Sequence, residues 1–319
     1  MSQKPNISGS DTLSFLKEKL GNTVSDLTLL SGGDWSQAYS FLKYGKKYVL
    51  RWSKSAEAFE KDSFATSFVS AFIPVPKIVD WGRQFDVFYA ISEFVDGIFL
   101  EKLTPSQLEA TIPSLFQLFD ALRNADLSNT TGYGGWDKDG KGSRKSWKEY
   151  LLDIRNDLAD KQDHDWYPEL ARSSVGTEGF NSLYQQMKVL VDKCPEDRQL
   201  IHADLLNSNL MIAGNKIGAV IDWQCSMYGD SLYEIAWFMY CRQYFPHFDD
   251  IQLCQKAIDH YKSTTANTTN LEERILCYQI HIGLGAVAYN SFKKDWTTAE
   301  KELDYTTNIV RNAKKLISM

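Results

Sequence analysis

The chain has 319 residues, of which 43% are hydrophobic and 13% aromatic, and its formal net charge is -6 at pH 7. This length suits two lobes or domains, and the hydrophobic share supports a buried core and excludes a disordered chain. The acidic balance argues against nucleic acid as the main partner and is compatible with a cationic small-molecule substrate, although a need for solubility alone would also explain it.

The five cysteines are odd in number, and no pair of them has CxxC spacing. We therefore expect neither a disulfide framework nor a zinc site, and a reducing cytoplasm fits this pattern best. Residues 1–11 are polar and lack the apolar segment of a signal peptide, and no apolar run is long enough to span a bilayer. The expectation is a cytoplasmic monomer with no membrane partner.

The first third of the chain alternates short β-rich runs with turns. A short amphipathic helix is predicted over 11–20, and helical spacing over 59–72 ends before Pro74 and Pro76. Four runs are predicted to be strands: 27–31, 38–42, 47–52 and 88–94. Asp96-Gly97 interrupts this pattern, so we place a boundary there between a sheet-rich lobe, residues 1–95, and a second lobe, residues 96–319.

Helices dominate the second lobe. Their predicted ranges are 105–124, 147–160, 179–193, 231–244, 251–263, 271–292 and 298–315. Residues 129–145 are rich in Gly, Ser and Thr and are expected to form a long loop. The predicted architecture is an α+β fold, with a small antiparallel β-sheet lobe and a larger, mainly helical lobe.

A predicted β-hairpin is the most informative feature of the chain. Two apolar runs, 210–212 and 217–221, are separated by a turn that contains Gly-Asn. The strands of a hairpin are antiparallel, so the chain enters and leaves it at the same end. Asn209, just before the first strand, and Asp222, just after the second, are therefore expected to meet, with Asp204 one tight loop away.

The residue types at this end of the hairpin indicate phosphoryl transfer. Asp204 and Asn209 have the spacing D-x-x-x-x-N, in which the Asp accepts or orients the proton of an attacking hydroxyl and the Asn holds metal. Asp222 follows a buried strand, where a carboxylate is costly unless it is paired, protonated or metal-bound. We predict Asp204 as the catalytic residue, Asn209 and Asp222 as Mg²⁺ ligands, and His202 as a support of the loop; taken alone, the spacing also occurs in ordinary loops.

Two features of the first lobe are candidates for binding phosphates. Arg51 ends a predicted strand, where kinases place a Lys that pairs with an acid of the next helix; that acid would be Asp62, with Glu60 as the alternative. The Gly-Gly turn before the second strand offers the backbone N–H of Gly33 and the hydroxyl of Ser36. Each feature alone is also typical of a solvated charge or an ordinary hairpin.

The connection between the lobes is the candidate for nucleobase binding. The segment from Glu93 to Val95 joins the lobes and can offer backbone N–H and C=O groups to a base. Only its position indicates this role, because its side chains give no signal.

Acidic residues of the second lobe are candidates for binding a cationic acceptor. Asp153 and Asp157 lie on one face of a predicted helix, and Glu234 lies in the first turn of another. A solvated helix face is the alternative for the first pair. Glu234 and the preceding Asp230 also fit the acidic start of a helix, or a support of the catalytic loop.

Several motifs together resemble the aminoglycoside phosphotransferases, and among them the hygromycin B phosphotransferases. They run nearly from end to end: Val24-Ser25-Asp26-Leu27, Leu30-Ser31, Tyr48-Val49-Leu50-Arg51, Ile73-Pro74-Val75-Pro76, Ala125-Asp126-Leu127-Ser128, Cys194-Pro195-Glu196, His202-Ala203-Asp204, Ile221-Asp222-Trp223 and Gly229-Asp230-Ser231. The resemblance implies a protein-kinase-like fold. It also implies ATP or GTP with Mg²⁺, and transfer of the γ-phosphoryl group to a hydroxyl of an aminoglycoside antibiotic.

The resemblance assigns roles by position. Asp204 becomes the base, Asn209 and Asp222 the metal ligands, and Arg51 with Asp62 the pair on the phosphate side. Two alternatives stay open: a kinase of the same fold that acts on a sugar, a choline-like amine or a homoserine-like alcohol, and a binding module without catalysis. A protein kinase is disfavoured, because Ala203 stands where an Arg would read a phosphorylated activation loop.

Overall fold

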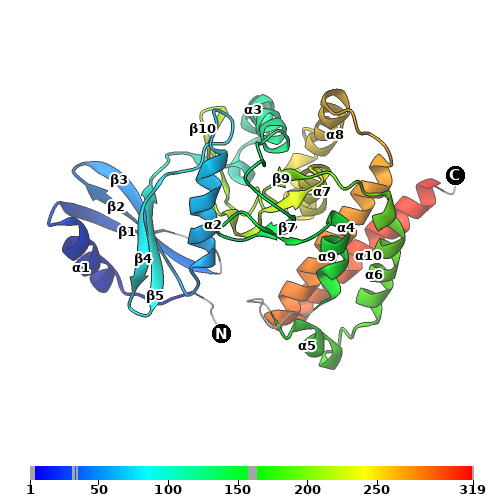
Figure 1. Ribbon diagram of the computed structural model, residues 1–319, viewed down its shortest axis with the longest axis horizontal. Coiled ribbons are helices and arrows are strands. Elements are labelled where there is room, and N and C mark those ends of the chain that lie inside the picture. Colours follow the sequence, from blue (N-terminus) through cyan, green and yellow to red (C-terminus); the bar gives the residue numbers. More distant parts are fainter. Residues whose placement is uncertain (1–3, 31–32, 34, 157–163, 318–319) are drawn as a thin grey trace. The chain divides into compact units, whose positions relative to one another are not determined.

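The computed structural model describes residues 4–30, 33, 35–156 and 164–317 (Figure 1). Contacts divide the chain into two compact units. Unit 1 contains residues 1–121, 137–141 and 204–225, and unit 2 contains the rest. This division does not follow the predicted boundary at residue 95, because most of a long helix over 105–123 and the predicted hairpin fall in the same unit as the N-terminal sheet.

Unit 1 is built on a five-stranded antiparallel sheet in the order β1-β2-β3-β5-β4. Its strands are β1 Val24–Leu30, β2 Ser36–Lys43, β3 Lys46–Ser53, β4 Ile78–Gln84 and β5 Val87–Glu93. Four of them match predicted strands. The edge strand β4 was not predicted, because its half-buried residues alternate with exposed ones such as Trp81 and its apolar pattern is weak.

Helix α1 (Gly9–Leu20) covers one face of this sheet. Phe15 of α1 packs against Trp52, with ring centroids 5.1 Å apart, and against Tyr89, at 4.8 Å. The indole N–H of Trp52 donates to the hydroxyl of Thr12, also on α1. Because side chains alternate along a strand, the opposite face carries the cross-strand row of Ala38, Arg51, Ala90 and Trp81.

Helix α2 (Glu57–Ala65) is shorter than the predicted helix over 59–72. A single 3₁₀ turn, Thr66–Phe68, follows it. The hydroxyl of Ser70 then accepts the backbone N–H groups of Phe72 and Ile73, at 3.2 and 3.1 Å. A serine that captures nearby backbone donors competes with helical hydrogen bonds, which explains the early end.

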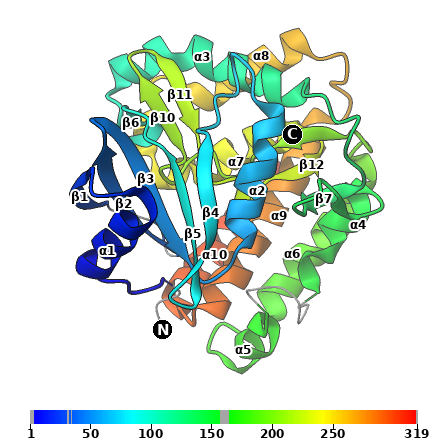
Figure 2. The same ribbon diagram turned by 60° about the vertical axis from the view of Figure 1, so that its left-hand side comes forward.

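The predicted hairpin is confirmed as β10 (Leu210–Ala213) and β11 (Lys216–Val220). A short third strand, β6 (Ile98–Phe99), pairs with β10, and helix α3 (Pro105–Arg123) lies beside the hairpin (Figure 2). The expected break at Asp96-Gly97 leads directly into β6. A Cβ at Gly97 would lie 2.7 Å from the carbonyl oxygen of Ile212, so this close pairing needs glycine.

Unit 2 contains a four-stranded sheet, two strands of which lie in the region predicted to be a long loop. Its order is β8-β7-β12-β9, formed by β7 Tyr133–Trp136, β8 Gly142–Arg144, β9 Gln199–Ile201 and β12 Met227–Gly229. The prediction of a long loop over 129–145 was wrong for β7 and β8. These strands are three and four residues long and contain three glycines, so they carry almost no side-chain alternation.

The helices of unit 2 pack around the long helix α9 (Leu271–Phe292). Its bounds match the prediction, and α10 (Trp296–Ile317) runs beside it, coloured orange and red in Figure 1. The remaining helices are α4 Trp147–Leu152, α5 Trp166–Arg172, α6 Glu178–Leu190, α7 Leu232–Cys241 and α8 Leu253–Thr264. Within the described ranges, no helix is long and apolar enough to cross a membrane.

We expect Gly134→Ala to destabilise the protein by about 2–4 kcal/mol. Gly134 of β7 has φ 74°, and a Cβ there would lie 2.1 Å from the Tyr150 ring. The neighbouring Gly135 has no heavy atom within 4 Å of the Cβ position, so Gly135→Ala is the matched control and should change the free energy of unfolding by less than about 1 kcal/mol. Urea unfolding measures both. Equal effects in the two variants would contradict this account of β7.

Candidate functional site

The mouth of the β10–β11 hairpin brings the two predicted metal ligands together. Leu210 pairs with Val220, and the next backbone bond runs from the N–H of Ile221 to the carbonyl oxygen of Asn209, at 2.9 Å. Asp222 follows Ile221 directly. The expected convergence of Asn209 and Asp222 is therefore fixed by backbone pairing and does not depend on side-chain conformation.

Asp204 is held by two amide side chains of its own loop. Asn209 Nδ2 donates to Asp204 Oδ2 at 2.9 Å and to the Asp204 carbonyl oxygen at 2.8 Å. Asn207 Nδ2 donates to Asp204 Oδ1 at 2.8 Å. Because Asn209 uses its nitrogen toward Asp204, its side-chain oxygen is the atom that a cation can bind. The predicted trio of Asp204, Asn209 and Asp222 thus lies within one connected loop and hairpin.

The backbone around these side chains is strained. Ala203, Asn207, Ser208 and Asp222 all have φ between 60° and 68°, the left-handed region that costs a residue with a Cβ about 1 kcal/mol or more. Such conformations persist only where neighbouring contacts fix them, and they gather at functional sites. Glu101 supplies one such contact, because it accepts the hydroxyl of Ser208 at 2.9 Å.

Arg51 and Asp62 form the ion pair that the sequence predicted, between β3 and α2. Asp62, and not Glu60, is therefore the partner. The guanidinium of Arg51 also stacks over the ring of Phe59, 5.1 Å from its centroid. The second oxygen of Asp62 accepts the backbone N–H of Trp223 at 2.9 Å, so the same carboxylate contacts the residue after Asp222.

The charges and donor atoms of this site suit a hard divalent cation. Burial raises the pKa of Asp222, the neighbouring charge of Asp62 raises it further, and Arg51 acts in the opposite direction. Lys61 also lowers this pKa, and a bound cation would further favour the ionised carboxylate of Asp222. In the described part of the chain, no three His, Cys, Asp or Glu side chains form a metal cluster. The oxygen donors of Asn209 and Asp222 are of the kind that Mg²⁺ binds, and Mg²⁺ takes its other ligands from phosphates and water.

A family model for the phosphotransferase enzyme family matches residues 26–264. Hygromycin-B 4-O-kinase of Escherichia coli is 31% identical over 284 residues, which are 88% of this chain and 79% of that protein. This chain belongs to the phosphotransferase enzyme family.

Solved structures confirm the predicted α+β, protein-kinase-like fold. Aminoglycoside phosphotransferase APH(4)-Ia superposes with a TM-score of 0.84 at 28% identity, over 95% of this chain and 99% of that one. A thermostable variant of it in ternary complex with AMP-PNP and hygromycin B gives 0.82 at 29% identity, over 93% and 97%. The gentamicin complex of APH(2")-IIa, at 17% identity and a TM-score of 0.64, shares the fold, over 95% and 97%.

The sheet face that carries Arg51 has small side chains around that residue. Strand residues near Arg51 on that face are small: Ala38, Ser40, Val49, Ala90 and Ser92. Gly33 is described but its neighbours 31, 32 and 34 are not, so the Gly-Gly turn stays a prediction. Ser36 begins β2 on the same face.

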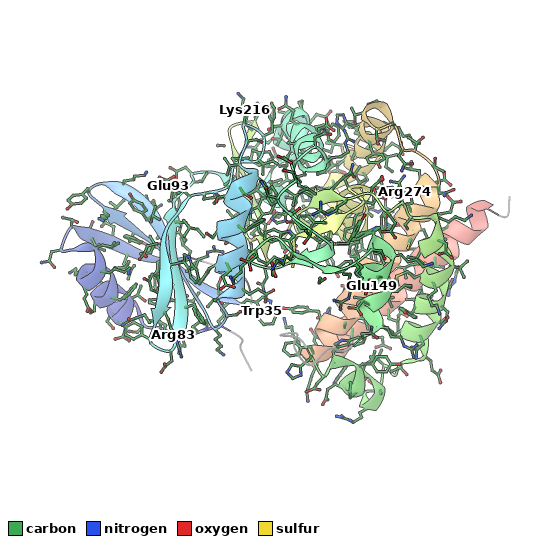
Figure 3. The ribbon with its side chains drawn as sticks, in the orientation of Figure 1. Trp35, Arg83, Glu93, Glu149, Lys216 and Arg274 are labelled. Carbon is green, nitrogen blue, oxygen red and sulfur yellow. The ribbon has the colours of Figure 1, made fainter. Side chains whose placement is uncertain are left out.

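The segment from Glu93 to Val95, at the end of β5, was predicted to bind a nucleobase. Glu93 donates its N–H to the carbonyl oxygen of Lys77 at 3.1 Å, and its carboxylate pairs with Lys46 at 2.6 Å. Glu93 is the last residue of β5 and is labelled near the upper edge of the sheet in Figure 3. The N–H and the carboxylate of Glu93 are therefore engaged, and base binding by the backbone of the segment from Glu93 to Val95 stays a prediction.

Glu234 lies inside unit 2 and supports the catalytic loop. It is only 4% exposed, and its Oε2 accepts the N–H groups of His202 and Ala203, at 2.8 and 3.1 Å. These residues directly precede Asp204. The prediction that Glu234 binds an acceptor is therefore corrected, because a buried carboxylate engaged with the backbone cannot serve a ligand. His202 is fully buried in this segment, as a supporting residue should be.

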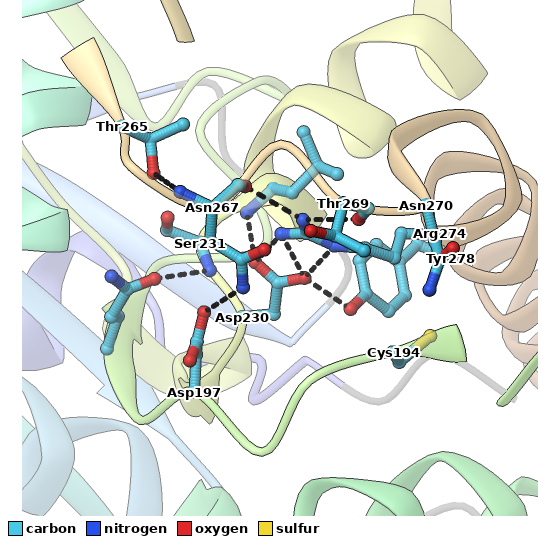
Figure 4. Close-up of polar contacts among 12 residues, drawn as sticks. Cys194, Asp197, Asp230, Ser231, Thr265, Asn267, Thr269, Asn270, Arg274 and Tyr278 are labelled. Carbon is cyan, nitrogen blue, oxygen red and sulfur yellow. Dashed lines mark hydrogen bonds and ion pairs between the residues drawn. The ribbon is translucent and has the colours of Figure 1, made fainter. Parts of the chain in front are cut away.

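Asp230 forms a buried network with α9 (Figure 4). It accepts Nε of Arg274 at 2.9 Å, Nη2 at 2.8 Å, and the hydroxyl of Tyr278 at 2.5 Å, and its backbone neighbour Leu232 donates at 3.1 Å. Burial opposes the charge of Arg274, but Asp230 raises the pKa of Arg274 above its ordinary value. Asp230 thus supports the start of α7, as predicted, and fixes it to α9.

Asp153 does not offer a free carboxylate to an acceptor. It pairs with Arg144 and accepts the amide of Asn156 at 2.5 Å. The helix predicted over 147–160 ends at Leu152, followed by a 3₁₀ turn, so Asp153 is not on the face of a continuous helix. Asp157 lies outside the described residues. The structure therefore does not support Asp153 as an acceptor-binding residue, because Arg144 already compensates the charge of its carboxylate.

Three supporting residues of the phosphotransferase were not predicted. Glu101, Lys61 and Arg274 contact, respectively, Ser208, the turn after Asp222, and Asp230. None belongs to a motif, and their partners are 44 to 163 residues away in the sequence. Only the fold brings each of them to its partner, so a single sequence holds no signal for them.

We expect Glu234→Gln to change how stability depends on pH. Burial raises the pKa of Glu234 to about 7, although the Ala203 and His202 N–H groups lower it. A raised pKa means that the folded state holds a proton that the unfolded state has released, so stability falls as pH rises from about 4.5 to about 7. This loss is ~3 kcal/mol and is absent in the Gln variant.

Urea unfolding from pH 4.5 to 8 measures this difference. The free energy of unfolding of Glu234→Gln, minus that of the wild type, should rise across the window and level off above pH 7. A difference that does not vary with pH would show that Glu234 is already ionised at pH 5 in the folded protein.

We also expect Arg274→Ala to destabilise the protein by about 3–5 kcal/mol, because Asp230 would be left buried without its cation. Arg172 and Glu169 form an ion pair with the same 2.8 Å separation, but Arg172 is exposed. Arg172→Ala is therefore the matched control and should cost no more than about 1 kcal/mol. Comparable losses in chemical unfolding would contradict the assigned role of the buried network.

Proposed function

We propose that this chain is a Mg²⁺-dependent phosphotransferase that moves the γ-phosphoryl group of ATP or GTP to a hydroxyl of an aminoglycoside antibiotic of the hygromycin B type. The observation that carries the proposal is the connected set of Asp204, Asn209 and Asp222 at the hairpin mouth. The proposal is also supported by the similarity of this chain to hygromycin-B 4-O-kinase and to structures of APH(4)-Ia variants that hold AMP-PNP or ADP together with hygromycin B.

The residues present can divide the reaction between them. Asp204 takes up or orients the proton of the acceptor hydroxyl, and its two amide contacts hold both carboxylate oxygens in place. Asn209 and Asp222 would hold Mg²⁺, which when bound neutralises charge on the phosphates. Catalysis then rests on position and electrostatics, as expected for a loose phosphoryl-transfer transition state.

The nucleotide would be held by the sheet of unit 1. Arg51 has five N–H donors in a planar fork, and its pairing with Asp62 leaves donors that can reach a phosphate. Gly33 and Ser36 can add a backbone N–H and a hydroxyl, and the backbone of Val95 can pair with the base. The choice between ATP and GTP is not encoded in these contacts.

The acceptor is proposed from relatives and from charge. An aminoglycoside carries ammonium groups, which a chain with a formal charge of -6 attracts. Phosphorylation at the 4-hydroxyl of hygromycin B is the first product to seek, because the curated relative is named for that position. The enzyme would act as a cytoplasmic monomer on a small molecule.

Asp204→Asn should lower kcat by about 10²–10⁴-fold while the Kd for ADP changes less than about threefold, because only the proton acceptor is lost. ATP consumption with hygromycin B gives kcat, and calorimetry gives Kd. Asp86→Asn, a fully exposed aspartate on a turn of the same unit, is the control and should retain full activity. Turnover by Asp204→Asn within tenfold of the wild type would contradict the assignment of the base.

An acceptor panel tests the substrate class separately. Hygromycin B and several other aminoglycosides are compared with sugars, choline and homoserine in the same assay, and mass spectrometry identifies the product. The expected result is a phosphorylated aminoglycoside and raised resistance of a susceptible bacterium that expresses the chain. Activity only on a metabolic alcohol would replace the proposed acceptor and leave the phosphotransferase site unchanged.

A further inference from the structure

A buried lysine beside the metal-ligand loop has no part in the mechanism above. Lys61 lies on α2, one residue before Asp62, and is only 3% exposed. Its Nζ donates to the carbonyl oxygen of Gln224 at 2.5 Å, and Gln224 lies in the 3₁₀ turn that follows Asp222. Lysine is almost never fully buried unless its ammonium group is paired, so this position requires a reason beyond packing.

Two consecutive residues of α2 hold the same turn. Asp62 accepts the N–H of Trp223 at 2.9 Å, and Lys61 donates to the carbonyl oxygen of Gln224. One backbone donor and one backbone acceptor are thus fixed from a single helix. Asp222, immediately before them, has φ 61°, a conformation that an aspartate keeps only when its neighbours hold it.

The charge of Lys61 also fits its surroundings. Burial lowers the pKa of Lys61, whereas Cys225, Glu57, Asp62 and Asp222 act in the opposite direction. A cation placed among these groups offsets part of the repulsion between Asp62 and Asp222. Without the charge of Lys61, the two carboxylates would repel each other more strongly in this buried region. That repulsion would destabilise the turn after Asp222.

We propose that Lys61 is a positioning residue for the metal site: by holding the Gln224 carbonyl group it fixes the backbone of Asp222 and sets the affinity of the nucleotide site for the divalent cation. This inference rests on the proposed function and adds to it a residue outside every motif. Helix α2 then supports both parts of the site, Arg51 through Asp62 and Asp222 through Lys61.

The test separates cation affinity from nucleotide affinity. Calorimetry gives the Kd for ADP in EDTA and in MgCl₂, and the ratio of the two is the gain that Mg²⁺ provides. Lys61→Met keeps the length of the side chain without its charge. It should reduce this gain about tenfold, or about 1.4 kcal/mol, while the Kd in EDTA changes less than about threefold.

Two further variants define the controls. Lys61→Arg retains a charged donor and should keep the gain to within about threefold of the wild type. Lys17→Met removes an exposed lysine of α1 and should leave both Kd values unchanged. The Mg²⁺ concentration for half-maximal turnover should rise in Lys61→Met in parallel with the calorimetric loss.

Several results would overturn the inference. One is a Lys61→Met variant in which Mg²⁺ strengthens ADP binding as much as in the wild type. Another is an equal weakening of ADP binding with and without Mg²⁺. A third is a Lys61→Arg variant as impaired as Lys61→Met, which would indicate that Lys61 acts by packing alone. If Lys61→Met does not fold, Lys61→Gln replaces it with the same two outcomes. A wild-type chain that gains nothing from Mg²⁺ would overturn the proposed function itself, and this is seen before any substitution is made.

Discussion

The antiparallel pairing of β10 with β11 is the constraint on which the candidate site depends. It places Asn209 and Asp222 at one end of a hairpin, and the bond from the Ile221 N–H to the Asn209 carbonyl oxygen closes that end. A shift of one residue in this register would turn the apolar side chains of the hairpin outward, so burial of the strands protects the geometry of the ligands. The residues with left-handed φ that flank the hairpin are conformationally unfavourable, and the strand pairing helps to hold them in that conformation. The chemistry of the site therefore relies on ordinary strand pairing and not on any unusual side chain.

Buried charge is handled differently in the two units, and this difference separates support from function. In unit 2, Asp230 is matched by the guanidinium of Arg274 and by two further donors, so nothing more is needed to stabilise it. Glu234 is matched only by backbone N–H groups, and its second oxygen has no hydrogen-bond partner among the described residues. In unit 1, burial and the neighbouring charge of Asp62 raise the pKa of Asp222, whereas Arg51 and Lys61 act in the opposite direction. A bound cation would favour the ionised form of Asp222, whereas Asp230 already has its cation, Arg274, within the fold.

Local patterns explain what the sequence could predict. The hairpin, its Gly-Asn turn and the D-x-x-x-x-N spacing each lie within about 20 consecutive residues, and α9 carries a long continuous apolar pattern, so these features were found with their correct residues. The Arg51–Asp62 pair also joins neighbouring elements. Strands β7 and β8 were missed because their glycines carry no alternation; β7 pairs with β12, about 90 residues later, and β8 pairs only with β7 among the described strands. Asp153 and Glu234 were predicted to bind the acceptor because a sequence shows that a carboxylate is present but not what already contacts it. Arg144 pairs with Asp153, and backbone N–H groups donate to Glu234.

The double role of Asp62 explains why arginine at position 51 suits this chain. One oxygen of Asp62 pairs with Arg51, and the other accepts the N–H of Trp223, so the carboxylate is shared between the strand and the turn of the metal ligand. A lysine would present a single compact charge and would have to divide it between Asp62 and a phosphate. The planar guanidinium instead stacks on Phe59, gives one of its N–H groups to Asp62, and has further donors in a fixed direction. The Arg51–Asp62 pair and the bond from Asp62 to Trp223 therefore link β3, α2 and the turn after Asp222, and the other donors of Arg51 are the ones proposed to hold a phosphate.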